Sequence, residues 1–147
     1  MKNTQSNNSN QKPSILVVDD EPDIRHLVQE ILQDEGYVVE VAEDGATARL
    51  AYEKHSPSLI LLDIWMPDID GISLLKEWTS NPDFIIPVIM MSGHGTVETA
   101  VEATRLGAFD FIEKPLSLAK LLSTVEHALN TGDTSSDAKL HTNQSVI

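Results

Sequence analysis

Polar residues that are able to carry out chemistry stand at the ends of short apolar runs in this sequence: Asp19, Asp20, Asp63, Ser92 and Lys114. Crowded carboxylates repel one another, and a hard cation such as Mg²⁺ relieves this repulsion by taking oxygen ligands. A carboxylate can also act as a nucleophile and form an acyl phosphate. Mg²⁺ and Lys114 would then neutralise the phosphoryl oxygens, and Ser92 would donate a hydrogen bond to one of them. These residue types therefore indicate magnesium-assisted phosphoryl chemistry.

Each of these residues also has an ordinary explanation when it is taken alone. Asp20 could cap the helix that follows it, and Asp63 could begin a turn. Ser92 could belong to a plain loop, Lys114 could be a solvated surface lysine, and Pro115 could simply end a strand. Their joint occurrence at the ends of apolar runs is what favours a common site.

The apolar runs predict five strands that would position these residues: Ser14–Asp19, Tyr37–Ala42, Ser58–Asp63, Pro87–Ser92 and Phe109–Glu113. Several runs do not alternate with polar residues, which is typical of parallel strands that are buried on both faces. A helix is predicted after each strand, at about 21–35, 44–54, 71–79, 96–106 and 117–130. The helix at 96–106 is one of the less clearly amphipathic ones.

Local signals support the first and last helices. Pro22 lies in the first turn of one helix, where a missing N–H costs little, and Gly36 can end that helix in the left-handed conformation. Ser117 is suited to cap the last helix. Five strand–helix units in succession predict a doubly wound α/β sandwich with helices on both faces of a parallel sheet. Ligands of such sheets bind beyond the carboxyl ends of the strands, so the polar residues would meet there.

Composition excludes several classes of protein. The chain has 147 residues, a net charge of −13 and no cysteine, so disulfides and cysteine-based zinc sites are excluded. Residues 14–130 contain 21 acidic residues against 7 basic ones, which argues against direct binding of nucleic acid. The apolar runs are too short to span a membrane, and the polar first residues do not resemble a secretory signal. We expect a cytoplasmic protein.

The two ends of the chain differ from the segment between them. Residues 1–12 are rich in Asn, Ser and Gln and predict a disordered lead, and residues 132–147 predict a flexible tail or linker. We therefore predict that residues 13–131 form the folded domain. The chain is then either a fragment of a longer protein or a stand-alone domain that works through protein contacts.

The chain resembles the receiver domain of bacterial two-component response regulators. The resemblance rests on motifs in the family's order and spacing: Ile15–Glu21, Leu62–Pro67, Asp70-Gly71, Met91–Gly93 and Glu113–Pro115. It covers about residues 13–130. The stretches Ser92–Ala100 and Leu106–Ile112 are most similar to the nitrogen-regulation branch of NtrC/NtrX type. The family fold is flavodoxin-like (CheY-like), with strand order 2-1-3-4-5.

The resemblance implies specific roles at the site. Asp63 would be the phospho-acceptor that takes phosphate from the phosphohistidine of a sensor histidine kinase. Asp19 and Asp20, or one of them, would hold Mg²⁺, or Mn²⁺ in its place, together with Asp63 and the backbone carbonyl of Trp65. Lys114 would pair with the phosphoryl group. The chain would catalyse its own phosphorylation and dephosphorylation, and no free-substrate enzyme is expected.

The resemblance also implies a switch. Ser92 would shift toward a phosphoryl oxygen, and Phe111 would move into the space that Ser92 leaves. The Lys114–Pro115 peptide bond is expected to be cis. The face formed by the fourth helix, fifth strand and fifth helix would then change, and a homodimer through this face follows by analogy. ATPase and DNA-binding domains outside this chain would link it to transcription.

Two residues are placed to tune the lifetime of the phosphate. Trp65 stands two residues after Asp63, and His94 two after Ser92; in the family these positions flank the attacking water. Both could instead be loop side chains with no kinetic effect. Trp65 also offers a test, since nearby Mg²⁺ should change its fluorescence more than that of Trp78.

Three other functions compete with the receiver. A haloacid-dehalogenase-like phosphohydrolase would have a second aspartate where Trp65 stands, and a cap domain that this chain lacks. A flavodoxin-like flavin carrier would have a hydroxyl- and glycine-rich loop where Asp19, Asp20 and Glu21 would repel the flavin phosphate. A pure interaction module would not need the intact set of five site residues.

Overall fold

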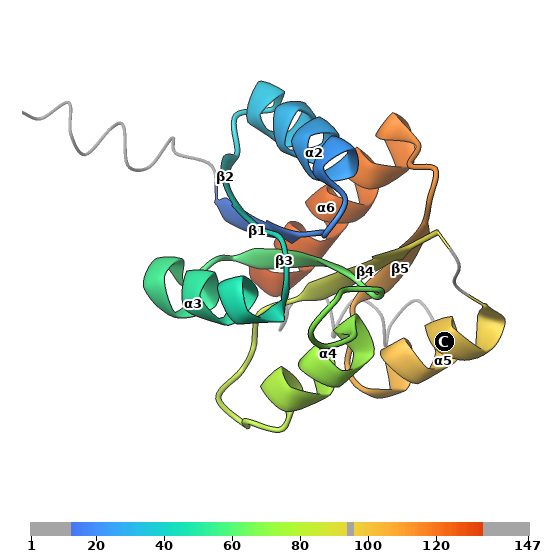
Figure 1. Cartoon of the computed structure of the whole chain (residues 1–147). Helices are drawn as coiled ribbons and strands as arrows, with labels where there is room; N and C mark the ends of the chain where they lie inside the picture. Colours follow the sequence, from blue (N-terminus) through green and yellow to red (C-terminus); the bar gives the residue numbers. More distant parts are fainter. Residues whose placement is uncertain (1–12, 94–95, 134–147) are drawn as a thin grey trace, which may run out of the picture.

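Five strands and five helices alternate along residues 13–93 and 96–133, the part of the chain that the computed structural model describes (Figure 1). The strands are β1 (Ser14–Val18), β2 (Val38–Ala42), β3 (Leu59–Asp63), β4 (Val88–Ser92) and β5 (Asp110–Glu113). The helices are α2 (Pro22–Asp34), α3 (Gly45–His55), α4 (Gly71–Thr79), α5 (Val97–Arg105) and α6 (Leu118–Asp133). Every predicted element is present, and the ends differ by at most three residues.

The strands form one parallel sheet in the order β2-β1-β3-β4-β5, as the receiver resemblance implied. The register brings the strand ends together. Val18 on β1 pairs with Leu62 on β3, so the aspartates that follow these two residues start from neighbouring positions. Ser92, the last residue of β4, pairs with Glu113 at the end of β5. The residues that we singled out from sequence therefore lie along one edge of the sheet.

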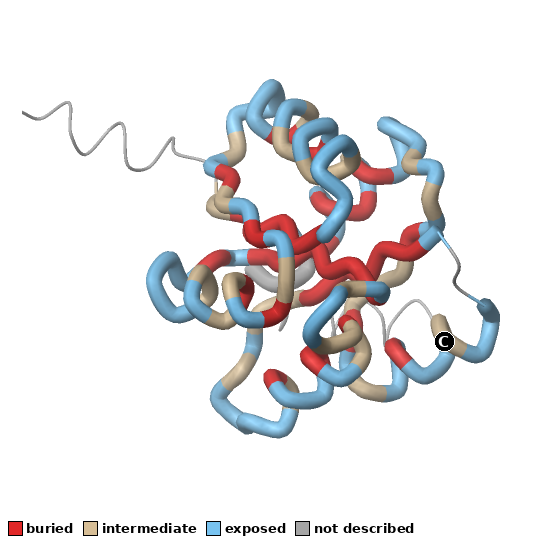
Figure 2. The backbone as a smooth tube through the Cα atoms, viewed as in Figure 1, coloured by how far each residue is buried: buried red, intermediate tan, exposed pale blue. Residues whose placement is uncertain are grey.

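Helices cover both faces of the sheet (Figure 1). Ile15 and Val17 on β1 pack in a cluster with the apolar residues of α2 and α6. Leu16 and Val18 point to the opposite face and pack with α3, α4 and α5. Figure 2 shows the buried residues concentrated along the central strands, and all five residues of β3 are buried. Burial on both faces explains why these strands do not alternate with polar residues.

The helix ends agree with most of the local signals. Pro22 begins α2, and Gly36 follows its last turn at φ 96°, a left-handed conformation that glycine adopts without strain. The N-cap position of α2 is occupied by Glu21, which makes no side-chain capping bond, and not by Asp20. The amide of Lys120 donates to the Ser117 hydroxyl at 3.3 Å, which agrees with a capping role at α6. Among the described residues, no helix is long and apolar enough to cross a membrane.

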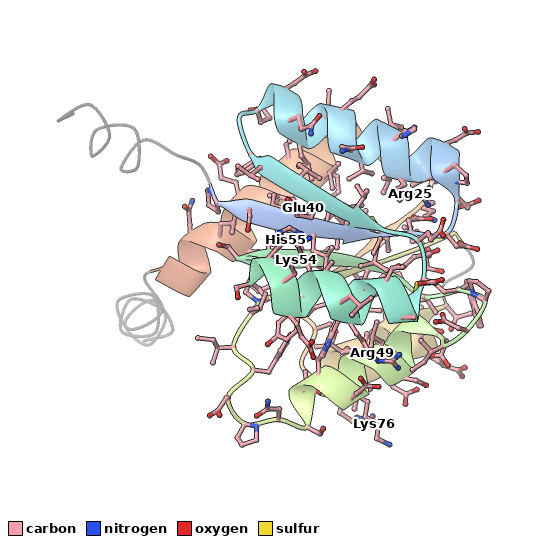
Figure 3. All side chains as sticks on the ribbon, turned by 60° about the vertical axis from the view of Figure 1, so that its left-hand side comes forward. Arg25, Glu40, Arg49, Lys54, His55 and Lys76 are labelled. Atoms are coloured by element: carbon pink, nitrogen blue, oxygen red, sulfur yellow. The ribbon has the colours of Figure 1, made fainter. Side chains whose placement is uncertain are left out.

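Helices α3 and α4 are joined by polar and aromatic contacts. Arg49 on α3 donates two hydrogen bonds to the carboxylate of Glu77 on α4, at 2.8 and 3.0 Å. Figure 3 shows Arg49 where α3 faces α4. The rings of Tyr52, Trp78 and Phe84 form a cluster beside this ion pair, with centroids 5.5–5.8 Å apart. These contacts hold the two helices together along the sheet.

Candidate functional site

Three aspartates meet at the carboxyl edge of the sheet. One oxygen from each of Asp19, Asp20 and Asp63 lies within 4.8 Å of the other two. Asp19 follows β1 and Asp63 ends β3, so the parallel pairing of these strands places both carboxylates side by side. Asp19 and Asp63 are buried, with 0% and 3% exposure, and Asp20 is exposed. The cluster therefore has a buried base and one side that is open to solvent.

Lys114 brings a positive charge to the aspartates from the end of β5. Its ammonium lies 2.9 Å from Asp19 Oδ2, 2.7 Å from Glu21 Oε1 and 3.5 Å from Asp63 Oδ1. Its backbone N–H donates to the carbonyl of Ser92 at 2.9 Å, which holds the end of β5 against β4. The Lys114–Pro115 peptide bond is cis.

Burial and charge shift the pKa values of two of these groups. Burial, and then the negative charge of Asp19, raise the pKa of Asp63 from 3.8 to about 7, although Lys114 opposes the shift. Burial lowers the pKa of Lys114, but its bonds to Glu21 and Asp19 outweigh burial and raise the value to about 12. Lys114 is therefore charged at neutral pH. The carboxylates carry more negative charge than one ammonium balances.

The donor set fits a magnesium ion. Oδ2 of Asp19 is buried and accepts no hydrogen bond of good geometry from the described residues, although it is ion-paired with Lys114. Carboxylate oxygens that are crowded in this way are the ligands that Mg²⁺ and Mn²⁺ prefer. The open side at Asp20 leaves room for waters, which Mg²⁺ retains. Asp19, Asp20 and Asp63 are thus able to hold a divalent cation together.

A cleft of about 510 Å³ opens beside the aspartates. It is lined by side chains from the ends of several strands, including Asp20, Asp63, Trp65 and Lys114. Trp65 is 53% exposed, so its ring stands at the cleft without being packed into the core. A small group bound at Asp63 would reach solvent through this cleft.

Ser92 and Phe111 lie on the same face of the sheet. Ser92 is buried at the end of β4, and Phe111 pairs across the strands with Met90, two residues before Ser92. Alternation along β4 places Met90 and Ser92 on one face, where Phe111 packs with Met90 in the core that α5 covers. His94, the second lifetime residue, lies outside the described residues.

Sequence reasoning did not assign roles to two residues that contact the site, Glu21 and Arg25, or to Asp68 on the loop that follows Asp63. Glu21 pairs with Lys114 across 93 residues of sequence, and the Arg25 guanidinium donates to the Asp19 carbonyl at 2.7 Å. Asp68 hydrogen-bonds to the start of α3. For Glu21, its place directly after Asp19-Asp20 was an available signal. No signal in the sequence connects Asp68 with α3.

Comparison with known proteins identifies the family. Residues 15–126 match the family model described as response regulator receiver domain. The chain belongs to this family. Its receiver domain is 49% identical over 122 residues to the nitrogen assimilation regulatory protein NtrX of Azorhizobium caulinodans, covering 80% of this chain and 26% of NtrX. It is 42% identical over 115 residues to the regulatory protein AtoC of Escherichia coli, covering 78% of this chain and 25% of AtoC.

Solved structures agree with this assignment. The receiver domain of NtrX from Brucella abortus is 49% identical, with a TM-score of 0.73 over 80% of this chain and 98% of that one. The signal receiver domain of a LuxO repressor protein from Vibrio parahaemolyticus is 31% identical, with a TM-score of 0.80 over 86% and 97%. This receiver spans about a quarter of the length of NtrX and AtoC. It is a signalling domain of the NtrX/NtrC type.

Proposed function

We propose that Asp63 accepts a phosphoryl group from the phosphohistidine of a sensor histidine kinase. Asp19, Asp20, Asp63 and the backbone carbonyl of Trp65 would hold Mg²⁺, or Mn²⁺ in its place. The observation that carries this proposal is the convergence of three aspartate oxygens within 4.8 Å, with the Lys114 ammonium 3.5 Å from Asp63. Membership of the receiver family supports this proposal, because residues 15–126, which match the family model, include all of these residues.

The reaction is an in-line displacement at phosphorus. A carboxylate oxygen of Asp63 forms the new O–P bond as the P–N bond of phosphohistidine breaks, and the imidazole nitrogen keeps the electron pair. The bound cation would neutralise charge on the phosphoryl oxygens. Lys114 pairs with one of these oxygens from the other side, and Ser92 donates a hydrogen bond to another. Hydrolysis of the acyl phosphate by water returns Asp63 to its starting state.

The phosphoryl group acts through a switch between Ser92 and Phe111. Ser92 moves toward the phosphoryl oxygen, and Phe111 moves into the space that it leaves. A groove of about 680 Å³ beside Phe111, lined also by Ala100 and Thr104 of α5, supports this movement. The surface formed by α5, β5 and α6 changes as a result. This surface would contact a second copy of the chain or an output domain.

The output is the control of transcription through domains outside this chain. NtrX of Azorhizobium caulinodans is named a nitrogen assimilation regulatory protein, and this chain covers about a quarter of its length. In our proposal residues 13–131 form the receiver, and residues 132–147 form a tail or linker toward an ATPase and a DNA-binding domain. The acidic receiver itself does not contact nucleic acid. The protein works in the cytoplasm, beside its kinase.

The lifetime of the phosphate is set by Trp65 and His94. Trp65 lines the cleft at Asp63, where its ring would shield the acyl phosphate from water. The half-life of phosphorylated Trp65→Ala and His94→Ala should therefore differ from that of the wild type. Unchanged half-lives would remove both residues from the proposal.

Acetyl phosphate tests the acceptor chemistry directly. Mass spectrometry after incubation with acetyl phosphate and Mg²⁺ should show a mass gain of one phosphate. The gain should disappear in Asp63→Asn and in EDTA, and remain in the control Asp83→Asn, an exposed aspartate away from the site. Turnover of a free phosphoester would favour a hydrolase instead. A mass gain that persists in Asp63→Asn would place the phosphate on another residue.

A further inference from the structure

The loop between Asp63 and α4 is attached to the start of α3 by one side chain. The Asp68 carboxylate accepts hydrogen bonds from the amides of Gly45 at 2.9 Å and Ala46 at 3.0 Å. The contact crosses 22–23 residues of sequence, and Asp68 is exposed to solvent. Helix α3 already has a local cap, because Asp44 accepts from the Thr47 amide at 2.8 Å. The second carboxylate at this helix end comes from the loop of the functional site.

The loop and the helix are in direct van der Waals contact at this point. A Cβ atom at Gly45 would overlap the Cγ2 atom of Ile69 and lie 3.3 Å from both carboxylate oxygens of Asp68. Glycine therefore lets the loop approach the first turn of α3 closely enough for Asp68 to reach two amides. Any larger residue at position 45 would push the loop away.

The other end of the loop is fixed at the phospho-acceptor strand. The Gly71 amide donates to the Ile64 carbonyl at 2.6 Å, and the Ile64 amide donates to the Met91 carbonyl on β4 at 3.1 Å. A Cβ atom at Gly71 would overlap the carbonyl of Asp63. Trp65 thus lies between two fixed positions of the loop: Ile64, whose carbonyl accepts from Gly71, and Asp68, which is bonded to α3.

The contact of Asp68 with α3 also connects the loop with the end of β2, which is hydrogen-bonded to Asp19. The Asp19 amide donates to the carbonyl of Ala42, the last residue of β2, at 3.0 Å. Helix α3 begins at Gly45, only three residues later. The bonds of Asp68 to Gly45 and Ala46 therefore complete a hydrogen-bonded connection from the backbone of Asp19 to the loop that follows Asp63.

We propose that Asp68 is a positioning residue for the magnesium and phosphoryl site. It fixes the loop that carries the Trp65 carbonyl relative to Asp19 and Asp63, without contacting the cation or the phosphoryl group. The inference rests on the proposed function, since it concerns the same site. Loss of residues that orient metal ligands typically weakens metal binding by about 10–100-fold. Asp68 acts through the backbone, so we expect an effect of about tenfold, at the low end of that range.

Two alanine variants separate positioning from helix stability. Asp68→Ala and Asp44→Ala each remove a carboxylate that accepts from the first turn of α3, but only Asp68 belongs to the loop of the functional site. Calorimetric titration should show about tenfold weaker Mg²⁺ binding in Asp68→Ala. Phosphorylation by acetyl phosphate should slow at low Mg²⁺ and recover at saturating Mg²⁺. Asp44→Ala should lower the midpoint of thermal unfolding while its Mg²⁺ affinity stays near that of the wild type.

A conservative variant completes the test. Asp68→Asn retains an acceptor oxygen for one of the two amides, so its Mg²⁺ affinity should fall between those of the wild type and Asp68→Ala; it also serves if the alanine variant does not fold. Equal Mg²⁺ affinity in the wild type and in both Asp68 variants would overturn the inference. So would an equal loss in Asp44→Ala. If the wild type itself binds no Mg²⁺ and gains no phosphate, the proposed function fails, and this inference fails with it.

Discussion

Helices α4 and α5 cover the same face of the sheet and have nine residues each, but they are held to it very differently. Helix α4, which follows β3 and Asp63, buries four residues, including Leu74 and Trp78. Helix α5, which follows the strand of Ser92, buries only Ala103. Val97 and Val101 on α5 are 80% and 50% exposed.

The difference indicates where movement costs least. Elements with few buried apolar contacts open at lower free energy than those that are anchored in the core. The proposed displacement of Ser92 occurs on the strand that leads into α5, so the weakly held helix adjoins the moving residue. Helix α4 and its loop would keep the proposed metal ligands in place during the same event. The tightly packed helix α4 would support the phosphorylation site, and the weakly packed helix α5 would change position in response to phosphorylation.

The largest loss of stability should come from substitution of Trp78 on the tightly packed helix α4. Its ring is 7% exposed and stacks on Phe84 with centroids 5.8 Å apart, so Trp78→Ala should cost about 3–5 kcal/mol in the free energy of unfolding. Urea denaturation measures this loss. The control is Trp65→Ala, an exposed tryptophan whose loss should change stability by about 0.5 kcal/mol or less. Equal losses in both variants would contradict the firm packing of α4.

The next largest effect is a pH-dependent loss of stability caused by the raised pKa of Asp63. Between pH 4 and pH 7 the unfolded chain releases the proton of Asp63 while the folded chain retains it, so the folded state loses stability as pH rises. In EDTA, Asp63→Asn should be more stable than the wild type at pH 8. This advantage should shrink as the pH falls toward 4. Thermal unfolding across this range is the measurement, and an advantage that does not vary with pH would show that the pKa is not raised.

Addition of Mg²⁺ should reduce or reverse this difference in stability. A cation that binds the folded wild type stabilises it by mass action, whereas Asp63→Asn has lost one of the ligands. Wild type and Asp63→Asn should therefore approach each other, or cross, as Mg²⁺ is added at pH 8. The same difference in EDTA and in Mg²⁺ would argue against a cation at these aspartates.

A smaller loss is expected from the single buried residue of α5. Ala103→Gly should destabilise the protein by about 1 kcal/mol, because glycine is the poorer helix former and leaves the buried methyl site empty. Chemical denaturation would measure the global change, and hydrogen exchange would show whether α5 opens separately. A loss as large as that of Trp78→Ala would mean that α5 is as firmly held as α4.

The smallest effect should come from the exposed ion pair between α3 and α4. Arg49 and Glu77 are 40% and 46% exposed, and ion pairs of this kind contribute about 0.2–1 kcal/mol. A double-mutant cycle with Arg49→Met and Glu77→Gln isolates the pair. A coupling energy well above this range would make the ion pair, and not the aromatic cluster, the main connection between the two helices.

The sequence was sufficient to predict the elements and their order along the chain. Hydrophobic runs without alternation predicted the buried parallel strands, and four of the five runs ended at a polar residue that the sheet brings to one edge. Contacts that depend on loop paths were not predictable. Asp68 and Gly45 meet only because the β3–α4 loop bends toward α3, and Glu21 reaches Lys114 only through the pairing of distant strands.

The ion pair of Lys114 with Glu21 has a consequence for how readily the phosphorylated state can be undone. The ammonium already has close carboxylate partners before any phosphoryl group arrives. In the proposed reaction, phosphorylation would exchange one anionic partner of Lys114 for another, so the free energy gained would be only the difference between the two contacts. After hydrolysis the lysine would return to Glu21 and would not be left as a buried, unpaired cation. Such a domain would pass through many cycles, because neither state would be a deep energetic trap.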